Sequence, residues 1–512
     1  MKASFKHAIK KVPISIAFVI CMGLTYYSFR YTNVFSTIFR AHAIEHKDNI
    51  LVHLLFTLLF FAIIKFFMMI FADKKNEERN CRILLIIVMG ATFILSLLWI
   101  NAAHCIPTSD QKMILQVASH FHDKNYSDLA DSAYIGMIRY QIRLAEIFLL
   151  LSKIFGSFDY HFFQYFNACM VPLIVLCGYG ILKECFENVK VRIVYCLFMI
   201  TCFPIMLYTT FVYGELLSIM LSMLLIWMSI LILTRKRLLL LVPAVISAIL
   251  GIWSKGTVWI TVIAVTIILV LYALKRKDIL LLLCAAAILL GPILANHILD
   301  DYYRHVSGYE LNQGIPFTAS IAMGLQGDPE NPGWFNSYTY HIYGHEGCNQ
   351  KKTNQAAIQN IEDSLKKFET NPDEMAAFFH NKLLLQWNAP DYEYMAMNSY
   401  YDSPPPAWIL SFFGGKLFDH AEFFLNEYQW LVYLGDVLGI VFLFLKREKY
   451  FFNILILNLI GGFLFTAVWE TKARYILSYI VIMVMISSYG WMQSVDFLSK
   501  KYEKGYSIKG KK

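Results

Sequence analysis

A carboxylate lies at the end of a long apolar run of this chain. The run closes near Ala102, and the polar segment 106–111 that follows it contains Asp110. In such a place a carboxylate can take a proton from an attacking hydroxyl group, or it can simply cap a helix or face solvent. We interpret Asp110 as a general base held at the mouth of a membrane helix.

Three more charged residues border or interrupt apolar runs. Glu215 opens one run, Lys255 breaks a nearly continuous apolar stretch from 238 to 274, and Arg474 lies at the start of the last run. The two cations suit phosphate binding, Arg474 through a bidentate guanidinium. Simpler roles stay open: capping for Glu215, snorkelling to lipid headgroups for Lys255 and interfacial anchoring for Arg474.

Composition places the chain in a membrane. Hydrophobic residues make up 57% of its 512 residues and charged residues only 16%, which is too apolar for a water-soluble globule of this length. The formal net charge of +8 comes from short basic clusters between apolar runs, as in cytoplasmic loops. We therefore interpret it as membrane topology and expect no nucleic-acid partner.

The apolar runs predict an all-α polytopic membrane protein with about twelve transmembrane helices. They lie at 13–29, 51–72, 83–102, 162–182, 192–208, 214–234, 238–253, 257–274, 279–296, 428–445, 450–468 and 475–495. A further apolar segment, 144–155, is too short to cross a bilayer, and counting it would put basic clusters on both sides. It is predicted to be a juxtamembrane helix along the headgroups.

This topology puts most of the polar chemistry on one side of the membrane. The loop at 103–160, the turns at 208–215 and 255–256, the long loop at 297–427 and the segment 470–474 all fall on the non-cytoplasmic face. We divide the chain into two N-terminal extra spans (1–82), a transmembrane core (83–296), a small outer-face loop domain (297–427), and three C-terminal spans with a basic tail (428–512). Within the loop domain, helices are predicted at 354–368 and from Asn371 onward, where Pro and two acids open the first turn.

No metal site is predicted, because His and Cys residues show none of the usual ligand spacings; dependence on a divalent metal stays open. Cys105 and Cys348 are the two cysteines placed outside the membrane. A bridge between them would tie the loop at 103–160 to the long loop.

The order of short motifs along residues 100–480 resembles the GT-C superfamily of lipid-linked-sugar glycosyltransferases, and within it the bacterial relatives of the protein O-mannosyltransferases. The motifs are Pro107-Thr108-Ser109-Asp110-Gln111, Tyr134, Tyr140-Gln141, Phe163-Gln164-Tyr165-Phe166-Asn167, Pro204, Tyr213-Gly214-Glu215, Ser254-Lys255, Gly333-Trp334-Phe335-Asn336, Lys382, Gln386-Trp387-Asn388-Ala389-Pro390 and Glu470-Thr471-Lys472-Ala473-Arg474-Tyr475.

The resemblance implies a multi-pass cell-membrane hexosyltransferase that moves a sugar, as a mannosyltransferase does, from a polyprenyl-phosphate carrier to a cell-envelope acceptor on the extracytoplasmic face. Membrane lipid, the lipid-linked sugar and the acceptor are its expected partners, and the donor lipid is the only cofactor-like molecule. Asp110 and Glu215 are the expected catalytic residues. The expected substrate-binding residues are Gln111, Tyr140, Gln141, Lys255, Lys382, Trp387, Glu470 and Arg474.

Two features depart from that family pattern. Many members carry two adjacent acids in the first outer loop, whereas here Gln111 follows Asp110, and residues 1–82 add two spans that the family core does not need. Two other functions therefore remain as alternatives: a transporter or lipid flippase, which the number of spans suits, and a non-catalytic membrane scaffold.

Overall fold

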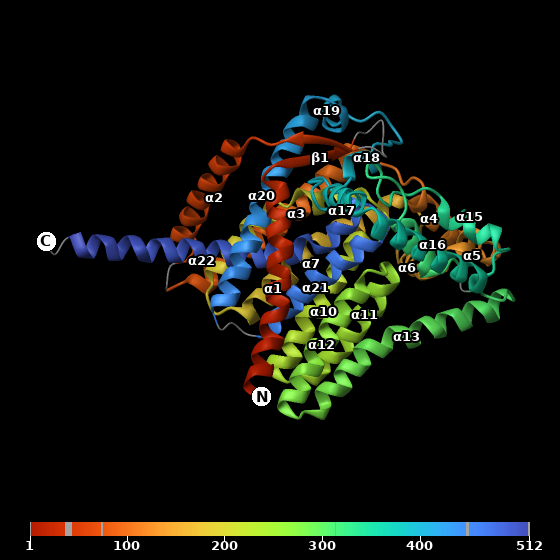
Figure 1. Cartoon of the computed structure of the whole chain (residues 1–512), viewed down its shortest axis with the longest axis horizontal. Coiled ribbons are helices and arrows are strands. Elements are labelled where there is room, and N and C mark those ends of the chain that lie inside the picture. Colours follow the sequence, from red (N-terminus) through yellow and green to blue (C-terminus); the bar gives the residue numbers. More distant parts are fainter. Residues whose placement is uncertain (1, 36–42, 73–74, 313, 447–449, 510–512) are drawn as a thin grey trace.

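The structure, a computed structural model, describes residues 2–35, 43–72, 75–312, 314–446 and 450–509. Within them the fold is almost entirely helical (Figure 1). The N-terminal unit comprises α1 (Lys2–Ser28), the antiparallel strands β1 (Tyr31–Phe35) and β2 (Ala43–Lys47), and α2 (Ile50–Phe71). The hairpin lies outside the bundle body and was not predicted from the sequence.

Eleven helices of four residues or more follow in the next part of the chain. They are α3 (Glu77–Ala103), α4 (Asp110–His122), α5 (Tyr134–Met137), α6 (Ile142–Phe155), α7 (Tyr160–Cys185), α8 (Lys190–Ile200), α9 (Phe203–Leu207), α10 (Glu215–Arg235), α11 (Leu241–Ser254), α12 (Val258–Arg276) and α13 (Ile279–Ser307). The predicted juxtamembrane segment is thus helix α6, which packs against α4 and α11.

The outer loop and the C-terminal part complete the chain. The loop contains α14 (Phe317–Gly324), α15 (Tyr338–His345), α16 (Gln350–Thr370), α17 (Pro372–Trp387), α18 (Tyr394–Met397) and α19 (Ala407–Gly414). The last part contains α20 (Lys416–Leu445), α21 (Asn453–Val468), the short 3-10 turn η6 (Ala473–Ile476) and α22 (Leu477–Lys509). The two helices predicted in the loop are α16 and α17, and Pro372 opens the first turn of α17 as expected.

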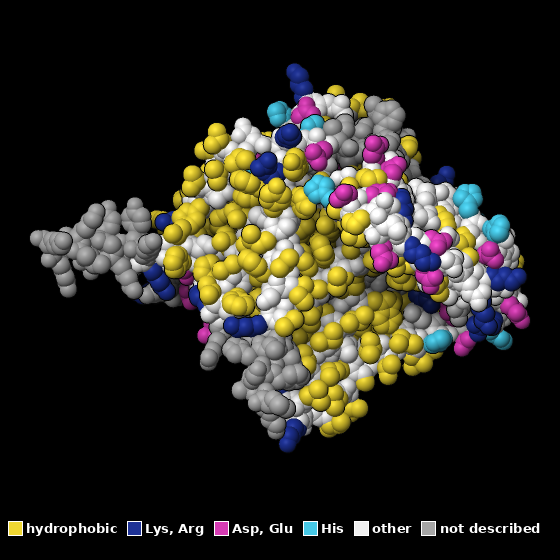
Figure 2. All heavy atoms as spheres, viewed as in Figure 1, with side chains coloured by type: hydrophobic (Ala, Val, Ile, Leu, Met, Phe, Trp, Pro, Cys, Tyr) yellow, Lys and Arg dark blue, Asp and Glu magenta, His cyan; other side chains and the backbone are white. Residues whose placement is uncertain are grey.

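Nine helices among the described residues are long and apolar enough to cross a membrane, and the pair Lys190–Ile200 and Phe203–Thr210, bent by 51°, makes a tenth if it forms one span. Two more of the predicted runs form shorter apolar helices, Leu238–Ser254 and Asn453–Val468. Since a crossing takes about 20 residues, length alone supports nine or ten spans, where the sequence predicted about twelve. Figure 2 shows hydrophobic side chains spread over the bundle, with charged side chains gathered toward the loop domain. The chain is a multi-pass membrane protein.

Two helices run further than the sequence predicted. Helix α13 continues past 296 to Ser307, where Gly308 ends it with a left-handed backbone (φ 69°), and α20 begins at Lys416 instead of 428. The polar end of α13 is stabilised by Asp300, whose carboxylate oxygens lie 3.2 Å from Arg139 and 3.4 Å from Arg143. These arginines belong to the α5–α6 region, so an ion pair links the polar end of α13 to that region.

The N-terminal unit is fastened to both the bundle and the outer loop. Helix α1 packs along α20, and the Thr25 hydroxyl donates to the carbonyl of Tyr433 at 3.0 Å. The backbone N–H of Asn33 in β1 donates to the carbonyl of Asn388 at 2.9 Å. The two extra spans therefore support the segment that follows α17.

Candidate functional site

Asp110 opens helix α4 and is held by a short hydrogen-bond chain. The hydroxyl of Tyr213 donates to Asp110 Oδ2 at 3.1 Å, and the amide of Gln141 donates in turn to the oxygen of Tyr213. Burial raises the pKa of Tyr213, so its hydroxyl keeps the proton that it donates. The carboxylate itself is only half-buried and can still receive a substrate.

Gln111 stands where many relatives of the resembled family carry a second acid. Its side chain is buried, and its Oε1 accepts the backbone N–H of Val212 at 2.7 Å. This bond ties the start of α4 to the turn that carries Tyr213 and precedes Glu215. The structure thus makes Gln111 a positioning residue for that turn, not a residue that faces a substrate.

Glu215, Lys255 and Arg474 form one ion cluster. Lys255 Nζ lies 3.1 Å from Glu215 Oε1, and Arg474 Nε lies 3.7 Å from the same oxygen. Glu215 opens α10, Lys255 follows α11, and Arg474 lies in η6 at the start of the last crossing. Burial lowers the pKa of Lys255 while Glu215 opposes that shift. With all three groups ionised the cluster carries one net positive charge.

Tyr213 joins the ion cluster to Asp110. The guanidinium carbon of Arg474 lies 5.4 Å from the centroid of the Tyr213 ring and 5.7 Å from that of Tyr475, within the range of cation–π attraction. A single aromatic ring therefore contacts the candidate base through its hydroxyl and the candidate phosphate ligand through its face. The predicted residues on three distant segments meet at one place.

Tyrosines surround Asp110. Burial raises the pKa of Tyr134 and Tyr340, and the charge of Asp110 adds to the effect in both cases; the pKa of Tyr340 rises to about 12. The Tyr140 side chain keeps 61% of its surface exposed, so one aromatic face of this group is open to solvent beside Asp110.

Glu470 lies on the far side of the same group. Its Oε2 accepts the hydroxyl of Tyr475 at 2.8 Å, and its charge acts on both Tyr140 and Tyr340. The side chain is half-buried. Glu470 is therefore a second carboxylate near Asp110, although it is separated from it by more than 350 residues of sequence.

Lys382 and Trp387 were expected to bind substrate, but the structure buries both. Lys382 has 0% exposure, and its Nζ donates to the carbonyl of Gly324 and, at 2.7 Å, to that of Trp469. Trp387 Nε1 donates to the Thr466 hydroxyl at 3.1 Å. Both side chains tie α17 to the end of α21.

Two acidic residues near the cluster were missed in the sequence. Asp391 and Glu393 lie in a fully buried loop after α17, and Glu393 Oε2 lies 3.5 Å from the backbone N–H of Arg474. Both Tyr392 and Glu393 have positive φ, 54° and 61°, a strained state that surrounding contacts must maintain. Nothing in the sequence marks the segment as buried, because its alternation of acids and tyrosines is typical of an exposed loop.

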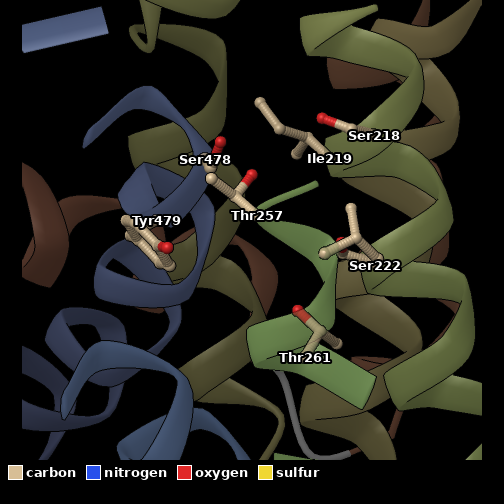
Figure 3. A pocket seen from close by; sticks show the side chains of 8 residues that line it. Ser218, Ile219, Ser222, Thr257, Thr261, Ser478 and Tyr479 are labelled. Atoms are coloured by element: carbon tan, nitrogen blue, oxygen red, sulfur yellow. The ribbon is translucent and has the colours of Figure 1, made fainter. Parts of the chain in front are cut away.

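Figure 3 shows a small cavity that is lined in part by side-chain hydroxyls. Its serine and threonine residues follow the three residues of the ion cluster in the chain, two to seven positions later. They are Ser218 and Ser222 after Glu215, Thr257 and Thr261 after Lys255, and Ser478 after Arg474.

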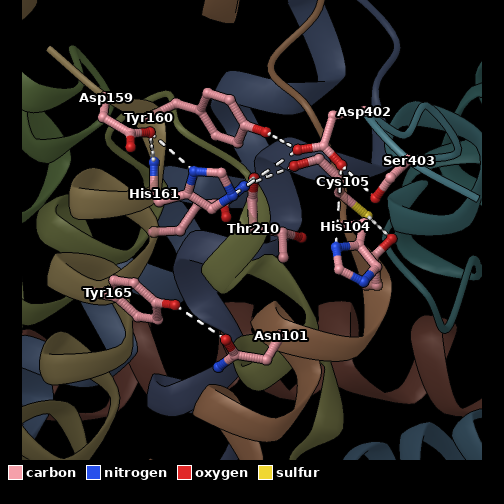
Figure 4. Close-up of polar contacts among 12 residues, drawn as sticks. Asn101, His104, Cys105, Asp159, Tyr160, His161, Tyr165, Thr210, Asp402 and Ser403 are labelled. Atoms are coloured by element: carbon pink, nitrogen blue, oxygen red, sulfur yellow. Dashed lines mark hydrogen bonds and ion pairs between the residues drawn. The ribbon is translucent and has the colours of Figure 1, made fainter. Parts of the chain in front are cut away.

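No group of three or more His, Cys, Asp or Glu side chains in the described part of the chain could hold a metal ion. Asp402 lies between His104 and His161 (Figure 4). The imidazole nitrogens lie 3.9 and 4.0 Å from its oxygens, and Tyr160 donates to it at 2.6 Å.

The disulfide considered from the sequence does not form. Cys105 and Cys348 are both free, and the Cys105 thiol lies 3.2 Å from the carbonyl of Asn398. That contact, together with the bridge between Cys105 and Tyr401, ties the loop at 103–110 to the segment after α18. These contacts supply the tie that a disulfide would have supplied.

Comparison with known proteins gives no family: no protein-family model and no curated protein matches the chain. What the site can do must therefore be argued from its own residues.

The turn that carries Glu215 depends on Gly214. Its φ is +86°, and a Cβ there would lie 2.7 Å from the carbonyl oxygen of Ser254, the residue before Lys255. We expect Gly214→Ala to destabilise the protein by about 1–2 kcal/mol from backbone strain alone, and by more if the two turns separate. The measurement is the thermal unfolding midpoint in detergent.

Gly256 is the matched control for Gly214. It lies in the adjacent turn, and a Cβ there would meet nothing within 4 Å. Gly256→Ala should leave the unfolding midpoint unchanged. Equal midpoints for the two variants would show that the contact of the turns does not depend on Gly214.

Proposed function

We propose that this protein is a membrane glycosyltransferase that moves a sugar from a polyprenyl-phosphate donor to a hydroxyl of an envelope acceptor on the outer face, with Asp110 as general base. The observation that carries the proposal is the arrangement around Tyr213. One ring contacts an accessible carboxylate on one side and a buried guanidinium on the other. The Tyr213 side chain therefore lies between the proposed base, Asp110, and the proposed phosphate ligand, Arg474.

The proposed reaction needs these two groups. The acceptor hydroxyl oxygen attacks the anomeric carbon, the new C–O bond forms, and the bond from that carbon to the phosphate oxygen breaks. Asp110 takes the hydroxyl proton, and the carrier leaves as a polyprenyl phosphate that has gained one negative charge. Phosphate is a good leaving group, so the site needs no second acid to protonate it.

The ion cluster suits the charge that develops on the leaving phosphate. Lys255 and Arg474 together carry two positive charges, and Glu215 offsets one of them. The remaining charge matches a phosphodiester in the ground state, and a cation held in a buried site stabilises the additional charge of the transition state. Glu215, with 1% exposure, is assigned the role of orienting the two cations.

Tyr140 and Glu470 complete the proposed site on its open side. Aromatic faces bind the apolar faces of sugar rings by packing, and a carboxylate can accept hydrogen bonds from sugar hydroxyls. Tyr140 is exposed beside Asp110, and Glu470 acts on the same ring. These two residues are proposed to orient the sugar or the acceptor, while Gln141 orients Tyr213.

Transfer from a panel of polyprenyl-phosphate sugars, by the purified chain and by Asp110→Asn, tests the proposal. We expect the variant to lose at least about 100-fold in rate, as general bases commonly contribute 10²–10⁴-fold, with the unfolding midpoint unchanged. Equal transfer by both proteins would remove Asp110 as the base. Absence of transfer by the wild type from every donor would contradict the proposed activity.

A further inference from the structure

Helix α20 carries a row of buried polar side chains through the bundle. Glu422, Asn426, Gln429 and Asp436 follow one another at intervals of four, three and seven residues, which places them on one helix face. All four are buried, and Asp436 has only 1% exposure. A polar face toward the protein interior, within a helix that crosses the membrane, requires an explanation.

Most polar atoms of this row have no protein partner. Neither carboxyl oxygen of Glu422, neither oxygen of Asp436 and neither polar atom of Gln429 makes a hydrogen bond with the described residues. Asp436 faces the backbone N–H of Ser487 on α22, but without hydrogen-bond geometry. Buried polar groups in native proteins are nearly always satisfied, and internal water is the usual partner where protein atoms are not.

The end of the row at Glu422 lies near the buried loop that carries Asp391 and Glu393, called the acidic loop below. Glu422 and Asp391 interact electrostatically, Asp391 in turn acts on Glu393, and Glu393 faces Lys472 and Arg474. Burial raises the pKa of Asp391 to about 6, although backbone N–H groups oppose the shift. Burial also raises the pKa of Glu393 to about 7, against the opposing charges of Lys472 and Arg474.

Two tyrosines lie close to the inner part of the row. Tyr392 lies near Gln429 and Asp436, and Tyr433 lies near Asp436 while its hydroxyl donates to the carbonyl of Trp387. The thiol of Cys21 on α1 is the other titratable group close to Asp436. Glu422 and Asp436 are fourteen residues apart on α20, which at about 1.5 Å per residue is about 21 Å along the axis.

We propose that α20 lines a file of internal water that connects the acidic pair Asp391 and Glu393 to Asp436, and that protons exchange along it between the outer site and the bundle interior. The ligand of this second site is the proton, and the path does not depend on the activity proposed above. Because Glu393 contacts the backbone of Arg474, the outer end of the path touches the ion cluster.

The alternative is that the polar row on α20 holds no internal water. In that case Glu422, Gln429 and Asp436 would be sealed from solvent, would not exchange protons with it and would serve only helix packing. The two readings differ in one measurable respect, which is whether the carboxyl group of Asp436 exchanges hydrogen for deuterium.

Infrared spectroscopy of the full chain in lipid nanodiscs distinguishes them. We expect the carboxylic-acid band that Asp436→Asn removes to shift within seconds of transfer to D₂O. We also expect the bands that Asp391→Asn and Glu393→Gln remove to titrate between about pH 5 and pH 8. If a variant fails to fold, carboxyl-¹³C aspartate separates the aspartate bands of the wild type, and carboxyl-¹³C glutamate the glutamate bands.

Two further variants test the path itself. Gln429→Leu, which places an apolar side chain midway, should slow the exchange of the Asp436 band at least tenfold. Glu427→Gln is the control, because its carboxylate already accepts a hydrogen bond from His53 at 2.9 Å, and it should leave the exchange unchanged. An Asp436 band that does not exchange in the wild type, or acidic-loop bands that do not change across this pH range, would overturn the proposal.

Discussion

Replacing Arg474 by Gln should lower kcat/KM for the proposed sugar transfer by about 10²–10³, the usual effect of removing one charged group that stabilises a developing anion. Arg474 lies 3.7 Å from Glu215 and packs over Tyr213, so in the proposed reaction its loss leaves the departing phosphate with Lys255 as the only cation of the cluster. Most of the loss should appear in kcat, since the charge on the phosphate increases in the transition state. Rates measured over a range of donor concentrations separate kcat from KM.

Two companion variants make this result specific. Arg474→Lys keeps the charge but not the planar fork, and should recover part of the loss. Lys472→Gln is the matched control, because Lys472 lies two residues away with its Nζ 3.9 Å from the Trp334 ring centroid, outside the ion cluster, and should transfer at nearly the wild-type rate. An Arg474→Gln enzyme with unchanged kcat/KM would remove the guanidinium from the mechanism.

Lys382→Met should destabilise the protein by about 2–4 kcal/mol, because it leaves the carbonyls of Gly324 and Trp469 buried without the donor that now satisfies both. The unfolding midpoint in detergent should fall by several degrees at neutral pH. A neutral amine has two N–H groups, so uncharged Lys382 can donate one hydrogen bond to each of the two carbonyls.

The same substitution should also change how stability depends on pH. Burial lowers the pKa of Lys382 to about 7, with the charge of Glu470 opposing the shift, whereas in the unfolded chain it is about 10.4. Between about pH 7 and pH 10 the unfolded state therefore binds one more proton, and this lysine makes stability rise with pH by up to about 1.4 kcal/mol per unit. Lys382→Met should lack that slope.

The exposed Lys366 on α16 serves as the control for both effects. Lys366→Met should retain the wild-type midpoint and the wild-type pH dependence. If Lys382→Met kept the rise in stability between pH 7 and pH 10, the titrating group would lie elsewhere and the buried amine would carry its charge throughout.

Much of the fold follows from local patterns. The apolar runs correspond to helices, the short segment at 144–155 is α6, and the Pro and acids after Asn371 open α17. Hydropathy and helix-start signals depend on neighbouring residues, so a single sequence displays them. The same patterns missed the polar end of α13, since that end is stabilised by arginines more than 150 residues earlier in the chain.

The candidate site was only partly predictable. The positions of the basic clusters predicted that Asp110, Glu215, Lys255 and Arg474 lie on one side of the membrane. In the structure the last three form one ion cluster. The sequence did not show that Tyr213 would join the cluster to Asp110. Nor did it show that the Lys382 side chain would donate to two backbone carbonyls.

The sequence by itself determined the class of this protein, a multi-pass membrane protein, and predicted that its charged residues gather on one side of the membrane. Removing apolar segments from water is favourable segment by segment, whatever their neighbours do. Only the tertiary structure decided which polar groups meet and which are sealed inside, as with Glu393 beside Arg474 and Asp436 on α20. Those outcomes depend on contacts between segments hundreds of residues apart, where burial sets the cost of every unpaired polar atom.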